Sequence, residues 1–308
     1  MNKRGVVVLA ALSMVILFAG WSYRVSAIGQ KGSSSEECSL EIVKIHPLPK
    51  KIEFASQRVP IELNYVREAI EREVLTTASM HTSTMLTLRR TARYFPIIEP
   101  ILKEHGVPSD FKYLALAESG LNENAFSPAK AAGVWQFIKS TAGEYDLECN
   151  SDVDMRYNIE AATHAACQYL LKSYEEFGDW ALVAASYNLG SAGVRRRLET
   201  QGVTDYWNLF LPEETMRYVP RIVAFKIFME SPRRYGFVLD EEDYFKPYTN
   251  YKEVEISEKN IDWSAFAASH STSYRVLRIL NPWIRTYTYA NPKGKSYMVK
   301  IPTAEFQP

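Results

Sequence analysis

Hydrophobic residues recur at every third or fourth position along most of the chain between residues 58 and 236. The pattern starts with Leu63, Val66, Ile70 and Val74. This spacing places apolar side chains on one face of an α-helix. No stretch of residues 60–236 alternates between apolar and polar residues as a half-buried strand does. The sequence therefore predicts a mainly α fold, with a helical body over residues 58–236.

The pattern changes after the helical body. The stretch Pro232–Asn250 is rich in Tyr, Pro and charged residues, and it predicts a linker over residues 237–250. Two strand-like segments then enclose two helix-like segments, in the order 251–256, 262–269, 273–280 and 296–301. We therefore expect a small βααβ domain over residues 251–303, which is marginal in size for folding alone.

Residues 1–27 predict an export signal rather than part of the fold. Two basic residues precede an apolar run from Gly5 to Trp21, and small residues follow at Val25–Ala27. These features are typical of a signal peptide, although a run of this length also allows an uncleaved membrane anchor. In either case we expect the rest of the chain to be exported to the periplasm or cell envelope. Residues 28–57, with a Gly-Ser patch and two prolines, predict a tether.

Charge and composition narrow the class of partner. The chain has 36 basic and 36 acidic residues, and this balance argues against nucleic acid or anionic lipid as the main partner. The 19 tyrosines and 6 tryptophans suit a carbohydrate groove, but they also suit an ordinary core. The five histidines are scattered and no Cys/His cluster has metal-ligand spacing, so we expect no metal and no cofactor.

The three cysteines leave at least one thiol without an intramolecular partner. Cys149 and Cys167 could form a disulfide in an oxidising compartment. Cys167 also fits the apolar face of a helix as a small buried residue. The sequence leaves both possibilities open.

One acidic residue, Glu118, lies where a helix does not favour a carboxylate. Pro108 predicts the start of its helix, with Ser109 or Asp110 as the N-cap, and Gly120 predicts the end. Glu118 is therefore in the last turn, where the helix dipole opposes negative charge.

The same helix places Glu118 on its apolar face. The residues seven, four and three positions before it are Phe111, Leu114 and Ala115. Burial and the dipole both favour the protonated carboxyl, which is the form that a general acid needs. The alternative is a Glu at a frayed helix end that turns into water.

Four short motifs follow one another along the helical body. Each alone has a structural explanation, such as a helix stop or a core aromatic, but their order and spacing point to one site. They are Glu118-Ser119-Gly120, Gly133-Val134-Trp135-Gln136-Phe137, Tyr187-Asn188-Leu189-Gly190, and Glu214-Thr215 with Tyr218-Val219.

These motifs resemble those of lytic transglycosylases of the soluble-transglycosylase, goose-type lysozyme-like superfamily, in particular the membrane-bound lytic murein transglycosylase D type. The resemblance covers residues 85–236, with its core motifs in 103–225, and implies a lysozyme-like helical catalytic domain. It makes Glu118 the single catalytic acid and base. The residues that it implies for substrate binding are Ser119, Gln136, Phe137, Tyr187, Asn188, Glu214 and Tyr218. Three positions depart from the family pattern: Lys130, Val134 and Ser186.

The C-terminal unit resembles a LysM-like domain, through Ser273–Trp283 and the closing Lys300-Ile301-Pro302. Such modules bind glycans that contain N-acetylglucosamine. This resemblance implies a glycan-binding domain over residues 251–303, and the alternative is a purely structural cap.

Together the two resemblances imply an enzyme that cleaves the β-1,4 bond between N-acetylmuramic acid and N-acetylglucosamine in peptidoglycan and leaves 1,6-anhydromuramoyl ends. One carboxyl acts first as acid and then as base. The alternatives are a hydrolytic muramidase and a non-catalytic peptidoglycan-binding protein. We expect peptidoglycan glycan strands as the partner and a monomeric protein, while the sequence identifies no partner among the cell-wall machinery.

Overall fold

The computed structural model of the chain describes residues 46–306. The predicted signal peptide or anchor at 1–27, and most of the predicted tether, lie outside this range. Among the described residues, no helix combines the length and the apolar character needed to span a bilayer.

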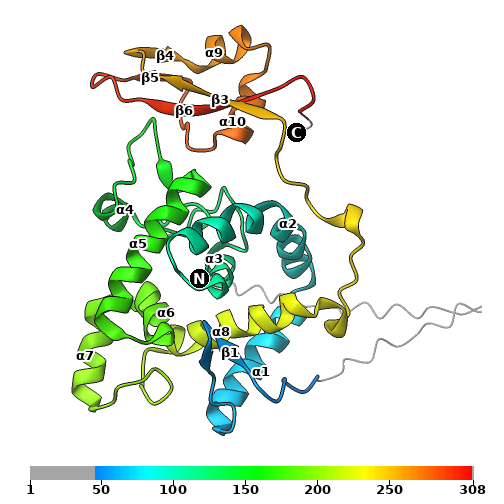
Figure 1. Cartoon of the computed structure of the whole chain (residues 1–308), viewed down its shortest axis with the longest axis vertical. Helices are drawn as coiled ribbons and strands as arrows, with labels where there is room; N and C mark the ends of the chain where they lie inside the picture. The colour runs from blue at the N-terminus through cyan, green and yellow to red at the C-terminus, as the bar shows by residue number, and fades with distance from the viewer. Residues whose placement is uncertain (1–45, 307–308) are drawn as a thin grey trace, which may run out of the picture. The chain divides into compact units, whose positions relative to one another are not determined.

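Eight α-helices form the body of the described part of the chain (Figure 1). They are α1 Asn64–Ser79, α2 His81–Glu104, α3 Lys112–Ser119, α4 Lys139–Glu144, α5 Ile159–Phe177, α6 Trp180–Leu189, α7 Ser191–Gln201 and α8 Glu213–Glu230. Short 3₁₀ turns precede α3 at Ser109–Phe111 (η1) and α5 at Met155–Tyr157 (η2). Helix α8 packs against α1, α3 and α6, so one element lines the core and also reaches the end of α3. The helical prediction for this body is confirmed.

Asn158 and Gly178 in the sequence predict the start and the end of a long helix, and both are confirmed in α5. Asn158 caps α5 by accepting a hydrogen bond from the Ala161 amide at 2.9 Å, and Gly178 ends that helix in the left-handed region. The N-cap prediction for α3 is wrong, because the 3₁₀ turn η1 replaces a capped start and Asp110 makes contacts elsewhere. Its carboxylate accepts from the Ala55 amide at 2.8 Å and from Lys226 at 2.7 Å.

The predicted tether ends earlier than residue 57. Strands β1 Glu53–Phe54 and β2 Gln57–Arg58, of two residues each, pair as a short hairpin. Phe54 is buried in the helical core, with its ring 5.4 Å from that of Phe111. Burial of Phe54 in the helical core therefore marks where the predicted tether ends and the folded body begins.

A proline within a helical stretch predicts a kink or an interruption, and Pro220 lies inside α8. The helix continues from Glu213 to Glu230 without a break. Because proline has no N–H, the carbonyl of Met216 loses its helical partner. The buried Tyr206 hydroxyl donates to that carbonyl at 2.9 Å and thereby replaces the lost bond.

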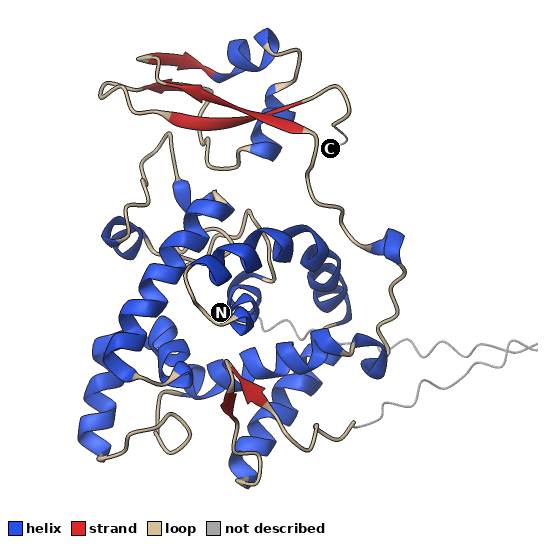
Figure 2. Cartoon of the chain, viewed as in Figure 1, coloured by secondary structure: helices blue, strands red, loops and turns tan. Residues whose placement is uncertain are grey.

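The C-terminal domain contains the predicted strands and helices and one further pair of strands. Strands β3 Tyr251–Ile256 and β6 Tyr297–Pro302 pair antiparallel, and helices α9 Trp263–Ser269 and α10 Tyr274–Leu280 lie between them in sequence. The added pair joins β4 Asn260–Asp262, before these helices, to β5 Thr288–Ala290, after them, in antiparallel orientation. Its strands have three residues each, too few to show alternation in the sequence. Figure 2 shows that this domain holds most of the strands, as the predicted fold class requires.

Cys149 and Cys167 are both free thiols, and Cys167 is fully buried on α5. Of the two possibilities that the sequence left open, the structure has the small buried residue rather than the disulfide.

We predict that Tyr206→Phe lowers the free energy of unfolding by about 1–3 kcal/mol, because it removes the hydroxyl donor that the partly buried Met216 carbonyl and the Thr215 carbonyl share. Chemical denaturation at neutral pH measures this change. Tyr65→Phe is the matched control, since Tyr65 is 54% exposed and its hydroxyl makes only a 3.4 Å contact with Asn208. Equal stabilities of the two variants would contradict the role of Tyr206.

Candidate active site

Glu118 lies one residue before the end of α3, and Gly120 ends the helix with φ = 58°. Phe111, Leu114 and Ala115 are fully buried, which confirms that Glu118 shares the buried face of this segment. The Glu118 carboxylate is half-buried and accepts a short hydrogen bond from the Tyr218 hydroxyl on α8. The side chain is therefore held against α8 and does not turn into water.

Burial is the main cause that raises the pKa of Glu118, from an ordinary 4.5 to about 7. The hydrogen bond from Tyr218 and the positive charge of Arg221 act in the opposite direction, and the negative charge of Glu214 raises the pKa further. The carboxyl group is thus partly protonated near neutral pH, so it can both donate and accept a proton.

Tyr187 on α6 lies beside Glu118. Burial raises the pKa of Tyr187 well above its ordinary value, and the nearby Glu118 charge is the next cause. The Tyr187 hydroxyl donates to the Trp135 carbonyl at 2.8 Å, and its ring contacts that of Phe137 at 5.9 Å between centroids. Tyr187 and Phe137 therefore form a wall next to the carboxyl group.

Ser119 connects α3 to the chain just before Phe137. Its hydroxyl is 2.8 Å from the Val134 carbonyl and 3.2 Å from the Ala115 carbonyl. Both contacts are to backbone oxygens, so in this structure Ser119 holds the chain at Val134 in place.

The segment Gly133–Phe137 has an unusual backbone. Gly133 has φ = 76°, and a Cβ atom there would lie 1.9 Å from the Arg156 carbonyl, so only glycine fits. Gln136 has φ = 50°, and its side-chain amide donates to the Gly133 carbonyl at 2.7 Å. Trp135 is fully buried, with its indole N–H 2.8 Å from the Thr163 hydroxyl. We call residues 133–137 the wall segment.

The two remaining predicted residues, Asn188 and Glu214, are exposed at the edge of the site. Asn188 accepts a hydrogen bond from Thr215 at 2.8 Å, and Glu214 accepts one from Arg221 at 3.0 Å. Their positions on α6 and α8 connect them to Tyr187 and Tyr218. The structure thus brings Glu118, Ser119, Phe137, Tyr187 and Tyr218 together and places Gln136, Asn188 and Glu214 around them.

The sequence analysis missed the ion pairs behind α8. Glu73 on α1 is 2% exposed, and its carboxylate accepts from Arg217 at 2.7 Å and from Arg221 at 3.3 Å. Arg221 is therefore fixed where its charge opposes the rise in the pKa of Glu118. The sequence does contain one sign of this ion pair. Glu73 is an acidic residue three positions after Ile70 on the apolar face of a helix, where a buried carboxylate needs a positively charged partner.

No group of three or more His, Cys, Asp or Glu side chains that could hold a metal ion occurs within residues 46–306.

Two family models match the chain. Residues 95–210 match the transglycosylase SLT domain, and residues 252–305 match the soluble lytic transglycosylase C-terminal LysM-like domain. The first match contains the motifs at Glu118, Gly133–Phe137 and Tyr187, and both agree with the resemblances inferred from the motifs.

A curated relative is the membrane-bound lytic murein transglycosylase D of Escherichia coli (strain K12), which is 32% identical over 187 residues. The match covers 59% of this chain and 40% of that protein, so the chain spans well under half the length of its relative. The chain is homologous to that protein over this region.

Two solved structures are also similar. The soluble lytic transglycosylase SLT70 from Escherichia coli is 17% identical, with a TM-score of 0.40, and the match covers 64% of this chain and 34% of that one. The lytic transglycosylase Slt from Pseudomonas aeruginosa is 18% identical, with a TM-score of 0.36, and the match covers 49% and 26%.

We predict that Glu118→Gln stabilises the fold at neutral pH. A carboxyl whose pKa is raised on folding destabilises the folded state increasingly as the pH rises from about 4.5 to about 7. Removing its charge should raise the free energy of unfolding by about 1–3 kcal/mol above pH 7 and have little effect below pH 4.5. Urea denaturation at several pH values measures this. Glu176→Gln, at a surface pair with Arg195, is the control, and a Glu118→Gln effect that did not grow with pH would contradict the raised pKa.

We also predict that Tyr218→Phe raises the pKa of Glu118 above its value in the unmodified protein. The hydroxyl donates to the carboxylate and so favours the charged form, which means that its removal favours the protonated form. A ¹³C NMR titration of the Glu118 carboxyl carbon measures the change. A pKa that stayed the same or fell would show that Tyr218 does not stabilise the carboxylate.

Proposed function

We propose that this chain, which carries a transglycosylase SLT domain and a LysM-like domain, is a lytic transglycosylase of peptidoglycan. The observation that carries the proposal is Glu118, a carboxyl group whose burial raises its pKa to about 7. It lies within the matched SLT domain, and Tyr187 and Tyr218 flank it. A group of this kind can protonate a leaving oxygen and then remove a proton from a nucleophile.

In the first step, Glu118 gives its proton to the oxygen that links N-acetylmuramic acid to N-acetylglucosamine. The bond between C1 of the muramic acid and this oxygen breaks, and N-acetylglucosamine leaves with a free 4-hydroxyl group. The 2-acetamido group of the muramic acid stabilises the positive charge that develops at C1. Glu118 is now a carboxylate, and the Tyr218 hydroxyl and the Arg221 charge stabilise it.

In the second step, the Glu118 carboxylate removes the proton from the 6-hydroxyl of the same muramic acid. The 6-oxygen forms a bond to C1, which gives a 1,6-anhydro ring and returns Glu118 to its protonated form. No water is consumed. Attack within one sugar competes well with water because its effective molarity is high.

The positions of the other carboxylates support a mechanism with one acid. A retaining glycosidase needs a second carboxylate about 5 Å from the first. Glu214 is exposed and paired with Arg221, while Glu73 is buried between two arginines. Neither carboxylate therefore acts as a nucleophile in this proposal, and the acetamido group takes that role.

The remaining predicted residues divide into two groups. Ser119 and Tyr187, whose hydroxyls hold backbone carbonyls, position the wall next to Glu118. Gln136, Asn188 and Glu214, which lie around the acid, contact sugar substituents. Phe137 provides an apolar surface that keeps water away. The C-terminal domain adds a glycan-binding surface.

For location, we propose the cell envelope. The apolar run in residues 1–27 indicates export, and the homologous protein from Escherichia coli is membrane-bound.

The decisive experiment is digestion of purified peptidoglycan sacculi, followed by mass spectrometry of the soluble products. We expect muropeptides with 1,6-anhydro ends, which are one water lighter than hydrolytic products. Glu118→Gln should reduce their release by at least about 100-fold, the size of a general acid's contribution, whereas Glu176→Gln should not. Products with reducing ends would indicate a muramidase, binding without any release would indicate a non-catalytic protein, and normal release by Glu118→Gln would exclude Glu118 as the acid.

A further inference from the structure

We infer that the C-terminal domain is a structural part of the Glu118 site. Through Asp154 and Arg156 it fixes the wall segment, and Arg156 is a positioning residue for the reaction. The inference rests on the proposed function only where its test measures enzymatic activity. Its physical content is a contact between two domains, and this can be tested without substrate.

The first observation is a hydrophobic core that both domains share. Three buried residues of the helical body, Ala132, Val153 and Tyr157, belong to the core of the C-terminal domain. Their partners there include Trp263, Trp283, Ile284 and Tyr297. Ala132 directly precedes the wall segment, so this core holds one end of it.

Backbone pairing also joins the domains. The Asp154 amide donates to the Trp283 carbonyl at 2.9 Å, and the Arg285 amide donates to the Asp152 carbonyl at 2.8 Å. Val153 and Ile284 thus form an antiparallel bridge. Two adjacent backbone bonds fix register as well as distance, as in a sheet.

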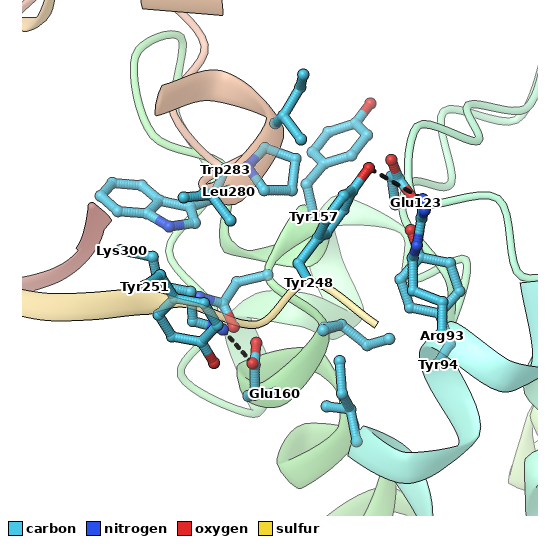
Figure 3. Close-up of a pocket in the computed structure, with 15 residues that line it drawn as sticks. Arg93, Tyr94, Glu123, Tyr157, Glu160, Tyr248, Tyr251, Leu280, Trp283 and Lys300 are labelled. Carbon is cyan, nitrogen blue, oxygen red and sulfur yellow. Dashed lines mark hydrogen bonds and ion pairs between the residues drawn. The ribbon is translucent and has the colours of Figure 1, made fainter. Parts of the chain in front are cut away.

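Polar side chains reinforce this contact on either side. Glu148 accepts hydrogen bonds from Lys295 and from the Tyr297 hydroxyl, both at 3.0 Å. Lys300 forms an ion pair with Glu160 at the start of α5. Side chains from both domains, including Glu160, Trp283 and Lys300, lie around a small cavity at this boundary (Figure 3).

That cavity has a volume of about 60 Å³. This is small beside typical ligand pockets, which measure about 300–1,000 Å³. The boundary is packed, which favours a structural role for it over a ligand site.

The linker is fixed as well. Its Phe245 amide donates to the Arg89 carbonyl on α2 at 2.9 Å. The Arg93 guanidinium lies 4.1 Å from the ring centre of Tyr248 and donates to its hydroxyl at 2.9 Å. A freely tethered binding module would not need these contacts.

Arg156 carries the contact onward to the wall segment. Its guanidinium forms two bonds to Asp154, at 2.9 and 2.7 Å, and the two side chains are 7% and 10% exposed. The Arg156 Nη1 atom also donates to the carbonyls of Lys130 at 2.8 Å and Phe137 at 2.9 Å. Burying a guanidinium is favourable only when its donors are satisfied, so this arrangement strongly fixes both carbonyls.

From the wall segment the contacts reach the acid. Ser119 binds the Val134 carbonyl, and Tyr187, which lies beside Glu118, binds the Trp135 carbonyl. A displaced wall would let water reach the carboxyl group and lower its pKa towards the ordinary value of 4.5. The other charged or titratable groups near this end of α3 are Tyr218, Arg221 and Glu214 on α8, Tyr187 on α6 and Arg90 on α2.

The first test compares Arg156→Gln and Arg156→Lys with the unmodified enzyme across pH. We expect kcat to fall by about 10- to 100-fold in Arg156→Gln, the range for a slightly misplaced site. The pH above which activity declines should move down by about one unit, because less burial lowers the pKa of the acid. Arg156→Lys keeps the positive charge but cannot make the two parallel hydrogen bonds of a guanidinium. It should therefore restore only part of the kcat and only part of the shift in the pH limit that Arg156→Gln loses.

A control separates positioning from stability. Arg195→Gln removes a surface arginine paired with Glu176, and it should leave kcat and the pH limit unchanged. If Arg156→Gln lowers activity by the same factor at every pH, the loss comes from unfolded protein and the positioning role is wrong.

The second test needs no activity. Ile284→Asp should detach the C-terminal domain, and hydrogen exchange followed by mass spectrometry should then show faster exchange at residues 125–137 and unchanged exchange in α7. If Ile284→Asp unfolds the helical body, Ile284→Ala applies the same test with a smaller perturbation. Unchanged exchange at residues 125–137 in a detached variant would overturn the inference. Faster exchange at residues 125–137 in the detached variant, together with no muropeptide release by the unmodified protein, would support the inference and reject the proposed function alone.

Discussion

The structure depends on keeping one carboxyl group away from water while holding it in hydrogen-bond contact. Glu118 costs free energy in its charged form because α3 places it against a buried apolar face. The Tyr218 hydroxyl and the more distant Arg221 charge offset part of this cost. These opposing effects set the pKa close to neutral pH, and neither alone would. A fully apolar site would keep the proton, and a fully ion-paired site would lose it.

Helix α8 supplies both offsetting groups, and its position is fixed from two sides. On one side, the buried carboxylate of Glu73 on α1 binds Arg217 and Arg221 of α8. On the other side, the Tyr206 hydroxyl donates to the Met216 carbonyl that Pro220 leaves without a helical partner. A break at Pro220 would separate Tyr218 from Arg221. The polar groups behind the helix therefore act on Glu118 without contacting it, by keeping these two residues in one continuous helix.

The sequence predicted what local patterns encode. The apolar face below Glu118 and the cap at Asn158 depend on residues within one or two turns, and both were predicted correctly. The roles of Tyr206 and Arg156 could not be predicted, because their partners are backbone carbonyls 10 and 19–26 positions away and leave no periodic signal. Asp110 shows the same limit, since a favourable local cap was replaced by contacts with Ala55 and Lys226. The contacts that act over long distances in sequence are those that complete the site.

The bridge between Val153 and Ile284 also has a temporal consequence. A chain synthesised from its N-terminus presents all four sequence motifs well before Ile284 appears. Contacts this distant in sequence form late in folding. The enclosure around the acid is then finished only after residue 284 has been added, and a chain that stopped before it would carry the motifs without the finished enclosure.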